Sequence, residues 1–108
     1  MQINLETKYC PKGIYQITSP GVYRDGSPAL KCLDQVGHPQ FTATVCIEGQ
    51  RPKPGHVFIK DWSENEGVLD ALLEAGIVEE PIRNVTCGFS VAHECKLTPL
   101  GIRVANND

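Results

Sequence analysis

The sequence lacks the features that identify several large classes of protein. No apolar run approaches the ~18 residues needed to span a bilayer, so we expect no membrane segment. There is no glycine-rich phosphate loop, no dinucleotide-binding fingerprint and no His-Glu-x-x-His motif, which are common signatures of nucleotide and zinc enzymes. Basic residues are not in excess either. The net charge is -3, which argues against electrostatic binding to nucleic acid or anionic lipid.

Cysteine is present in a pattern that does not predict disulfide bonds. The five cysteines are an odd number, and their spacing is irregular. The first residues, Met1 to Glu6, show no basic segment followed by a long apolar one, so we expect no secretory signal. These observations favour a reducing, cytoplasmic location and free thiols at Cys10, Cys32, Cys46, Cys87 and Cys95.

Length and composition predict one domain over residues 1–108. The hydrophobic fraction is 41% and the charged fraction is 21%, which are ordinary values for a globular chain and allow a modest core. No repeat, low-complexity tract or linker divides the sequence.

One segment, residues 64–75, has the pattern of an amphipathic helix. Ser63 is a residue type that caps helix N-termini, and a glutamate follows it at the capping-box spacing. Gly76 is suited to end the helix. Apolar residues at helical spacing form a stripe, in which we expect Leu69 and Leu72 to anchor the helix.

The rest of the chain is predicted to form short strands and turns. Asp25-Gly26, within residues 22–33, predicts a β-hairpin with a type I′ turn. Residues 41–47 alternate strictly between apolar and polar, and residues 56–60 predict a strand that leads into the helix. Pro99 and Gly101 predict a closing turn, and residues 106–108 predict a frayed polar tail. A further alternation over residues 85–97 places these side chains on one face: Cys87, Phe89, Val91, His93, Cys95 and Leu97.

These elements predict an α+β fold. Its sheet would be mostly antiparallel and meander-like, with about five or six strands. One α-helix, at residues 64–75, would pack against the sheet. Strands joined by short turns are expected to be neighbours.

The hairpin, the alternating strand and residues 57–67 (VFIKDWSENEG) resemble small proteins of unknown function that are carried by bacterial phages and plasmids. The resemblance covers roughly residues 21 to 97, and its motifs are structural. It implies a mobile-element context and, with it, an accessory or host-takeover role. No assigned activity carries over from it.

Cys87, His93 and Cys95 are the candidates for chemistry. They could bind zinc together with Cys32 or Cys46, but no pair has the Cys-x-x-Cys spacing. His93 and Cys95 could form a nucleophilic pair, although alternate positions of a strand lie about 6–7 Å apart. Cysteines at such positions are more often small core residues. We therefore predict structural thiols and no catalytic residue, metal or cofactor.

An acidic helix face is the predicted interaction surface. Seven carboxylates and no Lys or Arg lie between Asp61 and Glu80. In the predicted helix, Glu66, Asp70 and Glu74 follow one another at i+4 steps, where like charges destabilise a helix by a few tenths of a kcal/mol per pair. That cost suggests a use for the charges. The alternative is a solvated face that aids solubility.

Trp62 is the second candidate for partner binding. It is the only tryptophan, and tryptophan is enriched at interface hot spots. Packing at the core is the alternative, and it is the more common role of the residue.

The function predicted from the sequence is that of a small non-enzymatic binding or accessory protein of a mobile element, an inhibitor of a host or defence complex. The predicted partner is a protein of a nucleic-acid-binding host complex, because spaced carboxylates can occupy the positions of phosphates. Direct contact with nucleic acid or membrane is not expected, and the sequence predicts no particular oligomeric state. The alternatives are a small Cys/His-dependent enzyme and a structural or virion accessory domain.

Overall fold

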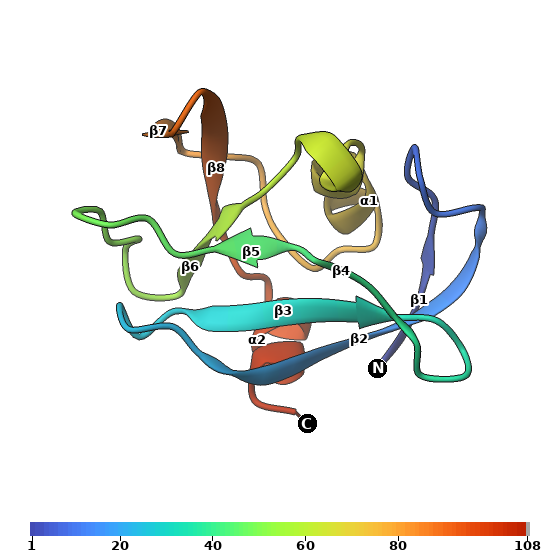
Figure 1. Ribbon diagram of the computed structural model, residues 1–108. Coiled ribbons are helices and arrows are strands. Elements are labelled where there is room, and N and C mark those ends of the chain that lie inside the picture. The colour runs from blue at the N-terminus through green and yellow to red at the C-terminus, as the bar shows by residue number, and fades with distance from the viewer. Residues whose placement is uncertain (108) are drawn as a thin grey trace.

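The strands form two antiparallel sheets, and not the single sheet of five or six strands that the sequence predicts (Figure 1). The computed structural model describes residues 1–107. Its elements are β1 (Gln2–Leu5), β2 (Gly13–Val22), β3 (Pro28–Leu33), β4 (Pro39–Thr42), β5 (Thr44–Val45), β6 (His56–Ile59), the 3₁₀ helix η1 (Ser63–Asn65), α1 (Val68–Glu74), β7 (Arg83–Cys87), β8 (Ser90–Lys96) and α2 (Pro99–Ala105). One sheet has the order β1-β2-β3-β4 and the other β5-β6-β8-β7. The α+β class and the antiparallel pairing are confirmed.

The segment predicted as one strand at residues 41–47 belongs to both sheets. The N–H of Ala43 donates to Leu30 O in β3, and Ala43 O accepts from the N–H of Lys60, which follows β6; both distances are 2.8 Å. The Thr44 hydroxyl supports the crossing, because its Oγ1 accepts the N–H of Leu30 at 3.1 Å. One extended segment therefore leaves the first sheet and enters the second at Ala43, which is why two sheets form.

The main core lies between the two sheets and beneath α1. The buried side chains of β1, β2 and β3 face those of β6 and β8 across this core. Ala43 and Phe41 belong to it, whereas Ile47, from the same alternating segment, belongs to a second core. The wholly buried residues of the main core include Leu30, Cys32, Val57, Ile59, Val68, Leu72, Ile77 and Cys95.

The second, smaller core lies on the other face of the β5-β6-β8-β7 sheet, around Phe58. Glu94 of β8 is wholly buried and accepts hydrogen bonds from Lys53 N–H at 3.0 Å and Arg83 Nε at 2.5 Å. Burial by itself raises the pKa of this carboxyl, but the hydrogen bonds from Lys53 and Arg83 outweigh burial and lower the pKa below its ordinary value. The charged carboxylate therefore ties the loop between β5 and β6 to β8.

The hairpin predicted at residues 22–33 is formed by β2 and β3, but its turn is not type I′. Gly26 has φ 88°, whereas Asp25 is not among the residues with positive φ, and a type I′ turn needs both. The N–H of Gly26 donates to Tyr23 O at 2.9 Å, and the N–H of Tyr23 donates to Ser27 O at 2.8 Å. This is a three-residue loop with glycine in the left-handed position.

The alternation at residues 85–97 is also a hairpin, so the single face predicted there is wrong. β7 and β8 pair with Cys87 opposite Ser90, and Gly88-Phe89 form the turn between them. Phe89 is fully exposed at this turn, and Val91 is exposed as well. Only Cys95 and Leu97 of the predicted face enter the main core.

The helix predicted at residues 64–75 is two short elements joined through Gly67, which has φ 96°. Ser63 is not the cap of α1, because it lies inside η1 with φ 58°. Asp61 Oδ1 takes that role and accepts the N–H groups of Gly67 at 3.1 Å and Leu69 at 3.0 Å. The predicted capping box therefore does not form, and α1 begins later.

A second helix, α2, occupies the segment predicted as a closing turn. Thr98 is its N-cap: Thr98 Oγ1 accepts the N–H of Gly101 at 2.9 Å and donates to Gly76 O at 2.6 Å. α2 packs against β2 and β3. The predicted frayed tail is wrong at Asn107, whose side chain pairs with the backbone N–H and C=O of Ser19; Asp108 lies outside the described residues.

Both α-helices have seven residues, which is too few for stability in isolation. Their caps and their packing hold them. Within residues 1–107, no helix has the length and apolar character needed to cross a membrane.

Substitution of Gly101 in α2 is expected to destabilise the fold strongly. A Cβ at this position would lie 2.1 Å from the backbone oxygen of Ile77, so Gly101→Ala must displace α2 from the chain after α1. We expect a loss of about 1–3 kcal/mol or more in the free energy of unfolding. The matched control is Gly21→Ala, because a Cβ there meets no heavy atom within 4 Å. Equal stability of the two variants in urea denaturation would contradict this docking.

Leu72 and Leu69 are expected to differ as anchors of α1, although the sequence pattern treats them alike. Leu72 is wholly buried, whereas Leu69 is only partly buried against the core. Leu72→Ala should therefore cost about 2–5 kcal/mol in the free energy of unfolding, and Leu69→Ala about 1–2 kcal/mol. Urea titrations of both variants measure this order, and the reverse order would mean that α1 is rotated relative to the position described.

Candidate functional site

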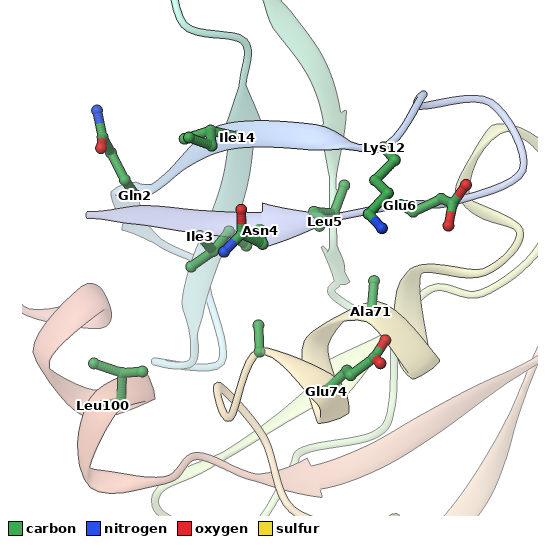
Figure 2. Close-up of a pocket in the computed structure, with 11 residues that line it drawn as sticks. Gln2, Ile3, Asn4, Leu5, Glu6, Lys12, Ile14, Ala71, Glu74 and Leu100 are labelled. Carbon is green, nitrogen blue, oxygen red and sulfur yellow. The ribbon is translucent and has the colours of Figure 1, made fainter.

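A groove of about 690 Å³ lies between the outer edge of β1 and the two α-helices (Figure 2). Residues 2–6 form one wall, and α1 together with Leu100 of α2 forms the other. Lys12, just before β2, and Ile14, near the start of β2, complete the lining. The volume falls in the range of sites that bind small molecules or peptide side chains. The groove is therefore the principal candidate site of the molecule.

The groove exists because α1 presents short side chains toward β1. Ala71 and Ala75 are one helical turn apart, and both line the groove. Figure 2 shows Ala71 and Glu74 on the helix across from β1, and Leu100 on α2 at the other side of the groove lining. Because alanine ends at Cβ, the helix cannot fill the space up to the strand.

The chain after β1 touches α1 at one end of the groove. The N–H of Lys8 donates to Glu66 O at 3.1 Å, and Lys8 Nζ lies 3.0 Å from Glu66 Oε2. A Cβ on Gly67 would lie 3.3 Å from Lys8 N and from Thr7 Cα, so glycine permits this close approach. This contact holds the segment after β1 against the residues that lead into α1, and Glu6, just before this segment, lines the groove.

The three carboxylates predicted as one acidic helix face do not share a helix. Glu66 precedes α1 at the end of η1, and it pairs with Lys8. Asp70 and Glu74 are both exposed, lie in α1 and are four residues apart. Of the three, only Glu74 lines the groove. The correction follows from the cap, because a helix that begins after Gly67 cannot include Glu66.

Trp62 lies away from the groove, half-buried against the second core around Phe58. Lys60 Nζ stands 5.6 Å from the centre of the Trp62 ring, a cation–π distance. These contacts favour the packing role of Trp62 over the hot-spot role.

Sequence reasoning missed most of the residues that line the groove. The alternation of Ile3 and Leu5 predicts a strand near the start, but alternation carries no signal of whether a strand is central or at an edge. Edge position depends on the long-range order of the sheet. The lining residues that were not predicted are Gln2, Ile3, Asn4, Leu5, Glu6, Lys12, Ile14, Ala71, Ala75 and Leu100.

The cysteine and histidine candidates do not form a reactive pair. Cys95 is wholly buried, and burial raises its pKa to about 12, so the thiol stays protonated at neutral pH. His93 Nδ1 instead lies 2.8 Å from Asn84 Oδ1. Within residues 1–107, no group of three or more His, Cys, Asp or Glu side chains is placed to hold a metal ion.

A second hollow of about 430 Å³ lies between the β2–β3 turn and residues 46–51. Arg24 and Arg51 line it, and Cys46 Sγ donates to Asp25 Oδ2 at 3.7 Å. The carboxylates of Asp25 and Glu48 in the same lining balance the charges of the two arginines, so this hollow has no marked preference for an anion.

Comparison with protein-family models finds no match, and searches among curated proteins and solved structures find no similar chain. The case for a function therefore depends on the groove and its lining.

Thiol reactivity is expected to follow burial. Cys32 and Cys95 are wholly buried, and burial is the main cause that raises the pKa of each to about 12, whereas Cys46 and Cys87 are half-buried. Iodoacetamide at neutral pH should modify Cys46 and Cys87 in the folded protein, and Cys32 and Cys95 only after unfolding. Peptide mass spectrometry measures the order. Labelling of Cys95 at the rate of an unfolded control would contradict its burial.

Proposed function

We propose that this protein is a non-enzymatic binding module that holds a basic segment of a partner protein in the groove between β1 and α1. The observation that carries the proposal is the composition of the groove. Apolar atoms of Ile3, Ala75 and Leu100 line it, and the carboxylates of Glu6 and Glu74 stand beside them. A lining that combines apolar surface with a few placed charges is typical of a binding site.

The charges of the groove favour a basic ligand. Within residues 1–107, neither Glu6 nor Glu74 takes part in an ion pair, and both are exposed. Lys12 is the one cationic side chain in the lining, so the lining has a net charge of about -1. Asp70 lies one turn before Glu74 and extends the negative surface along α1. A Lys or Arg of the partner would meet complementary charge here.

This proposal revises the acidic face predicted from the sequence. Because Glu66 is paired with Lys8, the free carboxylates of α1 are Asp70 and Glu74. The negative surface of α1 thus borders the groove through Glu74, with Asp70 one turn before it and outside the lining, and binding would combine apolar contact with charge.

The resemblance to phage and plasmid proteins adds a context to the proposal. In that context the module would be an accessory protein that occupies a basic segment of a host or defence complex in the cytoplasm. Basic segments that ordinarily hold nucleic acid have the charge that Glu6 and Glu74 would attract. Such binding would inhibit the host complex by competition.

Selection from a displayed library of short random peptides tests the proposal. The immobilised parent protein should enrich peptides that contain Lys or Arg. Ala75→Trp should abolish enrichment, because the indole would fill the groove. Glu74→Lys should weaken binding of the enriched peptides about fivefold to tenfold, since one favourable charge contact becomes a repulsive one. Fluorescence anisotropy with the selected peptides measures the change.

Glu79→Lys is the matched control for the charge change. Glu79 is exposed and does not line the groove, so the net charge changes equally without altering the site. Equal weakening by Glu74→Lys and Glu79→Lys would mean that only overall charge matters. Enrichment that persists in Ala75→Trp would place the binding site elsewhere, and either result would overturn the proposal.

A further inference from the structure

The backbone of β1 has an unpaired side that faces the groove. Met1 and Ile17 exchange both of their backbone hydrogen bonds, at 2.8 and 3.3 Å. In an antiparallel pair the hydrogen-bonded residues alternate, so Ile3 and Leu5 are the next residues of β1 that bond to β2. The N–H and C=O groups of Gln2 and Asn4 therefore point away from β2. Within residues 1–107, none of these two N–H and two C=O groups has a hydrogen-bond partner.

This edge lacks the devices that protect the edge strands β4 and β5. β4 begins with Pro39, and its Thr42 O accepts from the side-chain amide of Asn65 at 2.7 Å. β5 has only two residues. β1, in contrast, has no proline, no charged residue and no bulge from Gln2 to Leu5. An unprotected edge of this kind is a template for another strand.

We propose that the partner segment binds in extended conformation and adds to β1 as a further strand of the β1-β2-β3-β4 sheet. This inference rests on the proposed function and specifies how the same groove holds its ligand. The backbone of the segment would bond to Gln2 and Asn4, which gives affinity without regard to sequence.

The side chains of the added strand would alternate between two environments. Those that point inward would lie over Ala71, Ala75 and Leu100, where small or branched apolar residues fit. Glu74 lies on the same wall, and Glu6 lies just beyond the end of β1, so a Lys or Arg near either carboxylate is favoured. The ligand is therefore an extended peptide with alternating apolar residues and at least one basic residue.

A proline at residue 4 tests strand addition directly. The N–H of Asn4 points outward, so Asn4→Pro removes a donor that the ladder with β2 does not use, and Ile3 is already extended as a residue before proline requires. Library selection on Asn4→Pro should enrich no peptides, and peptides enriched on the parent should bind it at least about tenfold more weakly. Asn4→Ala keeps the backbone donor and should bind like the parent.

Thr86→Pro is the control for the effect of a proline at an edge. Cys87 and Ser90 close the β7–β8 hairpin as a hydrogen-bonded pair, so the N–H of Thr86, the neighbouring residue, points away from β8. β7 is an edge strand of the second sheet, whereas β1 and the groove belong to the first. This variant should bind the peptides normally. Thermal unfolding followed by circular dichroism verifies that all three variants are folded.

The outcomes separate this inference from the proposed function. If Ala75→Trp abolishes peptide binding but Asn4→Pro leaves it intact, the groove remains the binding site and strand addition is overturned. A second copy of the chain is the competing occupant of the edge. Sedimentation of the parent should show a monomer, and a dimer that Asn4→Pro dissociates would assign the edge to self-association and overturn the peptide as its ligand.

Discussion

The hydrogen bonds through Ala43 set the arrangement of the whole molecule. Its N–H belongs to the first sheet and its C=O to the second, so a single residue joins β3 to the end of β6. Thr44 completes the joint, because its hydroxyl accepts the N–H of Leu30 while its own carbonyl accepts the Tyr23 hydroxyl at 2.9 Å. Buried polar groups need hydrogen-bond partners, and these bonds supply partners at the crossing, where the regular strand pairing of neither sheet could do so alone. The two sheets then enclose the main core, and β1 remains as the outer edge of the first sheet.

The position of α1 follows from groups that precede it in the chain. Asp61 caps its first turn, and Gly67 lets the segment after β1 approach the backbone closely. These contacts hold one end of α1 against Lys8. Further along the helix, Ala71 and Ala75 leave space that a larger side chain would fill. The groove is thus a consequence of small residues at a fixed separation, and it needs no rearrangement to open.

Local patterns predicted the elements better than their assembly. The hairpin at residues 22–33 and the burial of Leu72 were predictable, because turn residues and apolar spacing are local signals. The division into two sheets was not, since strict alternation continues through Ala43 while the hydrogen-bonding partners change. The sequence pattern places the start of α1 too early. The residue that caps α1 is Asp61, which lies six residues before Gly67, and this separation does not match the capping-box spacing. The candidate site depends on the edge position of β1, which only the long-range pairing determines.

The acidic residues near β1 have a consequence for self-association. An unprotected edge strand tends to pair with the same strand of another copy. A second copy would bring its own Glu6 and Glu74 to this edge, in a protein whose net charge is already -3. Like charges brought together at an interface oppose the pairing, whereas a basic segment would be attracted by the same carboxylates. The charges thus discriminate between two occupants that the backbone of Gln2 and Asn4 could accept equally, and the discrimination should weaken as salt screens them.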